Sequence, residues 1–422
     1  MLKAVIPTKA IFLFLLHGAF CAMWSPPVLA QNFCRPSETT TSFGSWAAPN
    51  LTITKDARPT FRSYAPENVG FEPAAMRLLI QVESSTSKAW QLTLRDSHYR
   101  VLSTVSAEDF AFADGGEYRR QRWTEILRSA EIIFNLIVYD EGDISLNVVS
   151  ALLYPEASEA ANLFSVQGSS PAWQGLYSSR FDRAKQLGNT VGMLVSATYV
   201  QGRKSSWCCS GVVVAPSLFL TNWHCGGAGT LEDDQVWQQD VCRNTLVDLS
   251  WDDRPSRQKY SCKEVLVRNR PLDFALLRLE PVAGRVAVRA EPAKIARNPV
   301  GAGEEVFMIH HAMCKPKLLS SACNVGGTRV SPWRAVVGPG STPVARVLEA
   351  GISHTCDSEP GASGGPIFNT AGELVGIHQL GFRKPNSNES CVTDRTNTGI
   401  AIEKILEVIS EEAKDISREI RR

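Results

Sequence analysis

Short apolar runs recur along the chain, and most of them alternate with polar positions. In the first half they lie at 76–82, 90–94, 132–139 and 144–154, and β-branched residues are frequent within them. A period of two with β-branched residues predicts strands that have one buried face. With the runs at 100–104 and 118–126, this half predicts a small antiparallel β-sandwich.

The second half continues the pattern with shorter strands and more turn residues between them. Many short strands separated by turn signals are typical of a pair of antiparallel β-barrels. The tail at 401–421 instead has apolar residues at mostly helical spacing, which predicts a C-terminal helix. The strands predicted in this half lie at 190–198, 211–214, 218–221, 265–268, 274–279, 306–309, 344–352, 366–368 and 373–378.

The amino terminus has the features of a secretory signal peptide. Lys3 and Lys9 precede an apolar run at 10–16, and small residues at 28–30 suit cleavage after Ala30. The apolar run is shorter than the ~20 residues that a membrane-spanning helix needs. We therefore expect a secreted or periplasmic protein with no stable membrane insertion once the signal is removed.

Polar stretches divide the rest of the chain. Residues 31–60 are rich in Ser, Thr, Pro and Asn, and 155–185 is polar and mixed with a Gly-Ser-Ser-Pro break. The predicted organisation is therefore a signal peptide at 1–30, an N-terminal β-sandwich accessory or pro-domain at 31–154, a partly helical linker at 155–185 and a main domain at 186–422.

Composition describes an ordinary globular protein in an oxidising compartment. Hydrophobic residues make up 44% of the chain, charged residues 21%, and the formal net charge is +1, so nothing points to nucleic acid as a partner. Of eleven cysteines, Cys21 falls in the signal, which leaves an even number for disulfides. No metal or cofactor is expected, because the chain has no pair of CxxC knuckles and the adjacent His310 and His311 point to opposite faces of a strand.

Three motifs carry the chemistry. Gly361-Ala362-Ser363-Gly364-Gly365 presents a serine in a tight turn just before a strand, Asn222-Trp223-His224-Cys225 ends an apolar strand at a histidine, and Asp273 opens an apolar run. A serine hydroxyl is a poor nucleophile, so it needs an imidazole to take its proton and a buried carboxylate to orient that imidazole. The order is His, Asp, Ser, with separations of 49 and 90 residues.

This order and spacing resemble the chymotrypsin/trypsin family of serine proteases. Cys209, which precedes His224 by 15 residues, and the Gly-Glu-Leu-Val-Gly-Ile-His run at 372–378 extend the resemblance over roughly 185–405. Within the family, the Glu-Pro-Gly-x-Ser-Gly and Thr-Asn-Trp-His-Cys motifs are similar to those of secreted bacterial lysyl- and glutamyl-endopeptidase-like enzymes. The resemblance implies an all-β fold of two antiparallel barrels with a C-terminal helix, and a monomer that hydrolyses protein or peptide substrates.

The resemblance also implies roles for individual residues. Ser363 is the expected nucleophile, His224 the general base and then acid, and Asp273 the orienting carboxylate. The backbone N–H groups of Gly361 and Ser363 are the expected oxyanion hole.

Substrate choice has two readings, and the pocket candidates are Asp357, His378 and Gly381. Asp357 lies where trypsin keeps the carboxylate that binds Lys or Arg, which favours a basic residue at P1, the position just before the scissile bond. His378 lies near the position of a histidine that receives acidic side chains in glutamyl endopeptidases. The formal charge of Asp357 favours a Lys/Arg preference, with an acidic P1 as the alternative.

The family pattern also suggests disulfides. Cys209–Cys225 flanks the histidine strand, and Cys242–Cys262, Cys314–Cys323 and Cys356–Cys391 follow from proximity and from the disulfides that such domains use around the pocket. Cys34 and Cys208 remain as a further candidate pair.

One position departs from the animal enzymes. They carry an aspartate before the serine that pairs with a newly cut amino terminus, whereas this chain has Ala362. We therefore expect a pocket that forms without this switch.

Two rival functions stay open at this stage. Gly361-x-Ser363-x-Gly365 also fits the nucleophile elbow of α/β-hydrolases, although that fold needs the acid and the histidine after the serine. The other rival is a catalytically silent protease-like binding protein.

Overall fold

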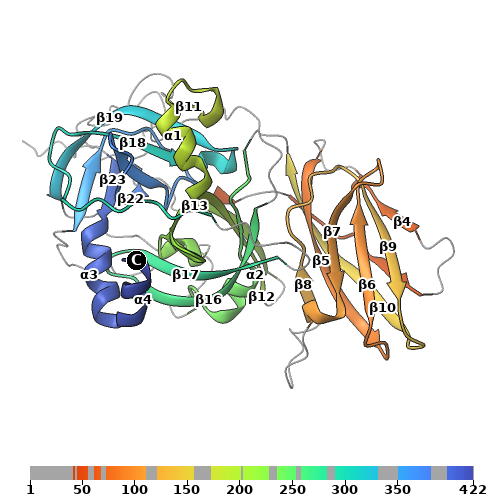
Figure 1. The fold of residues 1–422 in the computed structure, drawn as a ribbon. Coiled ribbons are helices and arrows are strands. Elements are labelled where there is room, and N and C mark those ends of the chain that lie inside the picture. The colour runs from red at the N-terminus through yellow and green to blue at the C-terminus, as the bar shows by residue number, and fades with distance from the viewer. Residues whose placement is uncertain are drawn as a thin grey trace, which may run out of the picture.

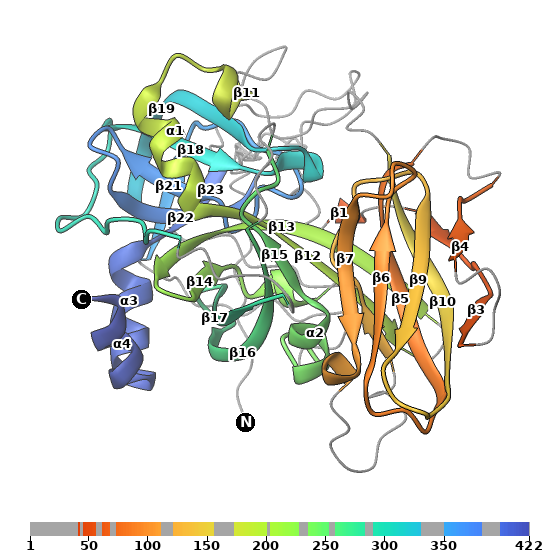
Figure 2. The same cartoon turned by 45° about the vertical axis from the view of Figure 1, so that its right-hand side comes forward.

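Strands form most of the structure and group into two closed barrels and a separate pair of sheets (Figures 1 and 2). The predicted all-β class, with two antiparallel barrels and a C-terminal helical segment, is confirmed. The predicted signal at 1–30, Cys34 and Cys391 lie outside the described residues. This computed structural model describes residues 41–42, 45–55, 61–67, 73–110, 121–155, 173–200, 203–227, 235–252, 258–282, 290–330, 350–381 and 397–421.

The first barrel is a six-stranded antiparallel sheet closed on itself. Its strand order is β13-β12-β15-β16-β17-β14, and pairing of β13 with β14 closes it. A short strand from far upstream, β1, pairs with the outer edge of β13. The strands are β1 (Thr41–Ser42), β12 (Val191–Val200), β13 (Arg203–Ala215), β14 (Leu218–Thr221), β15 (Leu246–Asp248), β16 (Lys259–Asn269) and β17 (Phe274–Pro281).

The second barrel repeats this arrangement, in the order β19-β18-β21-β22-β23-β20 with β19 paired to β20. Strand β11 pairs with β19, so part of the segment predicted as a linker belongs to this barrel's sheet. The strands are β11 (Trp173–Gly175), β18 (Glu305–His310), β19 (Leu318–Val330), β20 (Gly351–His354), β21 (Pro366–Asn369), β22 (Leu374–Leu380) and β23 (Asn397–Ala401).

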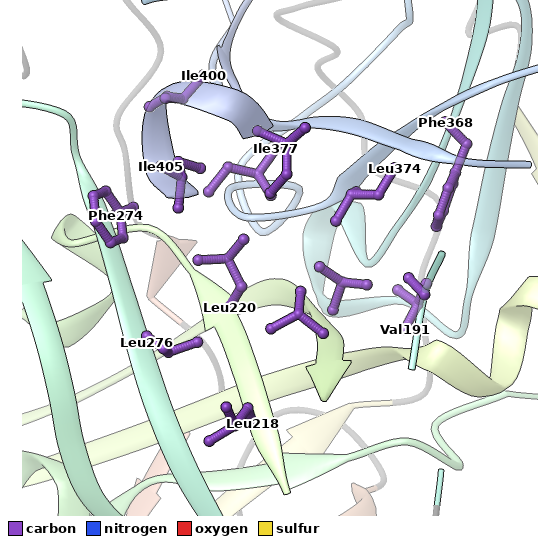
Figure 3. Close-up of a cluster of buried hydrophobic side chains, with 14 of the residues drawn as sticks. Val191, Leu218, Leu220, Phe274, Leu276, Phe368, Leu374, Ile377, Ile400 and Ile405 are labelled. Carbon is purple, nitrogen blue, oxygen red and sulfur yellow. The ribbon is translucent and has the colours of Figure 1, made fainter. Parts of the chain in front are cut away.

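The predicted C-terminal helix is present as two helices, because the backbone leaves the helical region at Ala413. Helix α3 buries Ile405 in a core that both barrels share, beside Leu220 of the first and Ile377 of the second (Figure 3). The helices are α1 (Asp182–Leu187), α2 (Gln239–Asn244), α3 (Ile402–Glu412) and α4 (Lys414–Ile420), with short 3-10 turns η1 (Ala107–Phe110), η3 (Leu176–Ser178), η4 (Gly188–Thr190), η5 (His224–Gly226) and η6 (Ala312–Cys314).

Two antiparallel sheets from residues 45–155 form what we call the N-terminal sheet unit. One has the order β2-β10-β5-β8 with β3 on β10, and the other has the order β4-β9-β6-β7. Both sheets contribute to one core, which contains Leu78 and Phe134. The strands are β2 (Ser45–Ala47), β3 (Leu51–Thr54), β4 (Phe61–Tyr64), β5 (Pro73–Ser85), β6 (Trp90–Arg95), β7 (Val101–Ser106), β8 (Gln121–Trp123), β9 (Ile132–Val138) and β10 (Ile144–Pro155).

The N-terminal sheet unit lies against the first barrel (Figure 1). Trp123 and Tyr154 of the unit share a buried apolar cluster with Met193 of β12. Beside the cluster, Lys259 forms a 2.8 Å ion pair with the buried Glu125. Apolar burial, the main driving force of association, therefore holds the unit to the barrel. No helix in the described part of the chain is long and apolar enough to cross a membrane.

Candidate active site

Strand pairing in the first barrel brings His224 and Asp273 together. Thr221 at the end of β14 pairs with Ala275 at the start of β17, so the residues beyond these two ends share one edge of the sheet. The His224 Nδ1 lies 2.8 Å from Oδ2 and 3.0 Å from Oδ1 of Asp273. The backbone N–H of His224 also donates to Oδ1, and Asn222 donates its amide to the Asp273 carbonyl at 2.8 Å.

This contact fixes the chemistry of the imidazole. A carboxylate can only accept, so Nδ1 carries the proton and Nε2 is the basic nitrogen of neutral His224. The Nε2 atom is buried and has no hydrogen-bond partner among the described residues. The ring therefore keeps a proton acceptor available beside the serine loop, the arrangement that general-base catalysis needs.

The serine loop rests on strand β13 and on the turn that contains Cys225. The Ser363 carbonyl accepts from the Ser210 N–H of β13 at 2.7 Å, and the sulfur of Cys225 lies 3.8 Å from that carbonyl oxygen. Gly364 has a φ of +81°, and a Cβ there would collide with the Ser210 carbonyl. The Ser363 Oγ donates to the Gln379 carbonyl at 3.5 Å. Strands β13, β14 and β22 thus hold Ser363 next to the histidine turn.

Gly361 adopts a backbone conformation that favours glycine. Its φ is +100°, and its carbonyl accepts from the Ser210 hydroxyl at 2.8 Å. The His311 N–H donates to the same hydroxyl at 2.9 Å. No acceptor for the Gly361 N–H lies within the described ranges.

Of the three specificity candidates, His378 contacts the serine loop directly. His378 in β22 accepts from the Gly364 N–H at 2.9 Å and donates its own N–H to Gly365 at 2.8 Å. The His378 ring is hydrogen-bonded to His354, for which no role was predicted, with 3.0 Å between His354 Nε2 and His378 Nδ1. Asp357 is buried, with its carbonyl held by Ser320, and Gly381 is buried directly after β22.

Four buried histidines lie near the serine loop. Burial, reinforced by neighbouring positive charge, lowers the pKa of His310 and of His311 to about 3. Burial also lowers the pKa of His354 to about 4 and holds that of His378 well below 6.5. All four are neutral in the folded protein at pH 7.

This set of histidines predicts acid sensitivity. Near pH 6.5 these histidines bind protons in the unfolded chain but not in the folded chain. Their contribution to the free energy of unfolding is therefore fully present above pH 6.5 and is lost as the pH drops from 6.5 toward 4. The slope is up to about 1.4 kcal/mol per pH unit for each histidine. Thermal unfolding between pH 8 and pH 4 measures it, with His311→Asn expected to reduce the slope and the exposed His98→Asn expected to leave it unchanged. An equal slope in all three proteins would contradict this origin.

The structure confirms two predicted disulfides and corrects the rest. Cys209–Cys225 and Cys242–Cys262 are formed. The predicted Cys314–Cys323, Cys356–Cys391 and Cys34–Cys208 pairings are wrong, because Cys208 bonds to Cys314 and Cys323 bonds to Cys356. Two of the three predictions assumed that cysteines near in sequence pair, whereas Cys314 lies in a turn that faces the first barrel.

A cluster of Cys209, His224 and Cys225 has ligand atoms within 4.8 Å of one another. The two sulfur atoms are bonded to each other, so they cannot supply thiolate ligands. His310 and His311 serve different partners, Ser320 and the Lys315 carbonyl, which agrees with the expectation that they do not act as a pair.

Residues 209–377, which contain His224, Asp273 and Ser363, match the trypsin-like peptidase domain. The chain contains a trypsin-like peptidase domain. The predicted family is therefore confirmed. The nucleophile-elbow alternative is wrong, since the strands around Ser363 pair in antiparallel fashion.

The chain is similar to a characterised protein and to solved structures. It is 26% identical over 206 residues to exfoliative toxin A of Staphylococcus aureus, a match over 47% of this chain and 62% of the toxin. The chain thus spans less than two thirds of that relative. Among structures, it is 16% identical to the active form of Rv3671c protease from M. tuberculosis, over 61% of this chain and 93% of the other, with a TM-score of 0.40. The chain is 14% identical to the inactive form of Rv3671c protease, over 55% of this chain and 93% of the other, with a TM-score of 0.36.

Proposed function

We propose that this protein is an exported serine endopeptidase that hydrolyses peptide bonds through an acyl-enzyme. Ser363 is the nucleophile, His224 the general base and acid, and Asp273 the group that orients the imidazole. The observation that carries the proposal is the state of the His224 ring. Its Nδ1 is hydrogen-bonded to Asp273, and its Nε2 has no hydrogen-bond partner among the described residues.

Each step uses side chains or backbone groups of the serine loop, His224 and Asp273. The Ser363 Oγ attacks the peptide carbonyl while its proton moves to His224 Nε2, and the Asp273 carboxylate stabilises the imidazolium that forms. The negative oxygen of the tetrahedral intermediate accepts from the N–H groups of Gly361 and Ser363. The imidazolium then protonates the leaving amine, and a water molecule repeats the sequence to release the acyl group.

Export is part of the proposal. Four disulfides are formed among the described residues, and disulfides persist in the periplasm or outside the cell. We assign the protease to the two barrels with the C-terminal helices, and the N-terminal sheet unit to an accessory domain. Its buried cluster with Met193 supports a domain that stays with the enzyme.

For P1 we propose an acidic side chain, received by His378. The His354 Nε2 lies 3.0 Å from His378 Nδ1, so Nε2 is the nitrogen of His378 left to face a substrate carboxylate, and it donates to that carboxylate when the ring is protonated. Burial lowers the pKa of His378, and the neighbouring His354, His310 and His224 lower it further. A substrate carboxylate would supply a counter-charge and would favour protonation of His378. A basic P1 bound by Asp357 is the rival.

Cleavage of a peptide library by wild type, His378→Asn and Asp357→Asn tests the function and the preference together. We expect wild type to cleave after Glu or Asp, with kcat/KM for these substrates about 10- to 100-fold lower in His378→Asn, since a hydrogen bond to a charged group contributes about 1.5–3 kcal/mol. Asp357→Asn is the matched control and should keep the acidic preference.

Other outcomes separate the alternatives. Cleavage after Lys or Arg that is lost in Asp357→Asn would establish the basic rival and reject the acidic pocket. A folded wild-type protein that cleaves no peptide in the library would overturn the endopeptidase proposal and favour a silent binding protein.

A further inference from the structure

The Cys208–Cys314 disulfide connects the two barrels directly beneath the serine loop. Cys208 lies in β13, next to the cysteine that bonds to Cys225, and Cys314 ends the turn η6 that follows β18. The bonded cysteines are 106 residues apart in sequence, and both are buried. It is therefore a long-range link placed at the junction where the catalytic residues meet.

The oxyanion turn packs onto this link. A Cβ built on Gly361 would lie 3.0 Å from Cys208 Sγ and 2.6 Å from the His311 carbonyl oxygen, so the backbone at this glycine has no free space on that side. The Met313 N–H, next to Cys314, donates to the Pro360 carbonyl at 2.6 Å. Cys208 thus packs against Gly361. The turn η6, which contains Cys314, binds Pro360, the residue before Gly361.

The turn itself is held from outside the second barrel. The Trp251 Nε1 of the first barrel donates to the Cys314 carbonyl at 2.9 Å. Arg128 of the N-terminal sheet unit stacks over the Trp251 ring, with its guanidinium carbon 4.5 Å from the centroid, and donates to the Ser250 carbonyl. Cys208 and Cys314 also belong to the apolar cluster that joins the sheet unit to the barrel.

We propose that the Cys208–Cys314 disulfide is a positioning element for the reaction, which holds the Gly361 N–H where the oxyanion forms. The inference rests on the proposed function. Without the link, η6 and β13 can separate, and the Gly361 peptide loses the surface that fixes its direction. Oxyanion stabilisation depends on donors that are oriented before the charge develops, so a small displacement lowers the rate of acylation.

The test compares two double variants that each remove one buried disulfide without leaving a free thiol. Cys208→Ala/Cys314→Ala removes the proposed positioning element, and Cys242→Ala/Cys262→Ala removes a link in the first barrel between α2 and β16. We expect kcat of the first to fall at least tenfold, within the 10²–10³-fold range for complete loss of an oxyanion donor, while KM changes less than threefold. The control should keep kcat within threefold at a temperature where both variants are folded.

A second measurement separates positioning from general destabilisation. A peptide boronate, whose tetrahedral adduct occupies the oxyanion hole, should lose affinity for Cys208→Ala/Cys314→Ala by the same factor as kcat/KM. A product peptide should bind equally well to the variant and to wild type. Equal kcat in both double variants and wild type, or equal loss in both double variants, would overturn the proposal.

A milder variant decides the matter if the first double variant does not fold. Trp251→Phe removes the hydrogen bond to the Cys314 carbonyl and keeps the disulfide, and we expect kcat to fall severalfold with KM unchanged. Unchanged kcat in Trp251→Phe would then count against the proposal. Absence of wild-type activity would instead mark failure of the proposed function, because both inferences assume a working Ser363.

Discussion

Ser363→Ala is expected to lower kcat by about 10⁶-fold, the loss found when the nucleophile of a serine protease is removed. The substitution deletes only the Oγ, whose hydrogen bond to the Gln379 carbonyl is long at 3.5 Å. The loop keeps its backbone bond from Ser210, so the protein should remain folded with unchanged KM. Steady-state kinetics on the preferred peptide, together with labelling by a fluorophosphonate, measures the effect.

Labelling makes the result specific to one oxygen atom. Wild type should incorporate one fluorophosphonate on the peptide that contains Ser363, and Ser363→Ala should incorporate none. Ser145→Ala is the matched control, because Ser145 lies in β10 of the N-terminal sheet unit and binds Glu83. If Ser363→Ala retained more than about 1% of wild-type activity, another nucleophile would be responsible and the mechanism above would be wrong.

The residues that we propose as catalytic could be picked out from the sequence because each lies in a motif with local chemistry. Gly364 is required at its φ of +81°, and the apolar runs beside His224 and Asp273 are strands that pair. These requirements act over a few residues, so they are visible in the order of amino acids. The His354–His378 contact was missed because it joins β20 to β22 across β23, which pairs with both, and no local pattern records that order.

The missed strands show where period-two reasoning fails. Strand β19 contains many small or polar residues, with Ser320 buried and Ala322 at a φ of +55°, so the alternation is broken. In β23 even Asn397 is fully buried, since its amide donates to the Cys356 carbonyl and to Ser358. A polar side chain whose partners lie in a distant loop looks like a surface residue in the sequence.

Some of the predicted disulfide pairings were wrong for a related reason. Cysteines close in sequence were paired where family spacing gave no guide, but a disulfide depends on how Cβ atoms approach in the fold. In the second barrel β18 pairs with β19, which places Cys323 beside Val306, while Cys314 lies past the end of β18 against the first barrel. Only the two pairings that stay within the first barrel were predicted correctly.

Asp273→Asn carries the second large expected effect, a loss of about 10⁴-fold in kcat. The carboxylate accepts from His224 Nδ1 and from the His224 N–H, so it fixes both the ring and its backbone. An amide would keep the shape but can present its NH₂ group to Nδ1, which favours the tautomer with the proton on Nε2. That tautomer cannot accept the Ser363 proton, so acylation slows while substrate binding is preserved.

Asp248→Asn is the matched control for this change. Asp248 is also a fully buried carboxylate of the first barrel, but it binds the N–H and hydroxyl of Ser250, away from the imidazole. We expect Asp248→Asn to alter thermal stability while kcat stays within a few fold of wild type. Similar losses of kcat in both variants would mean that Asp273 acts only by supporting the barrel, whereas a loss confined to Asp273→Asn, with KM unchanged and the folded fraction equal, locates its effect in the protonation state of His224.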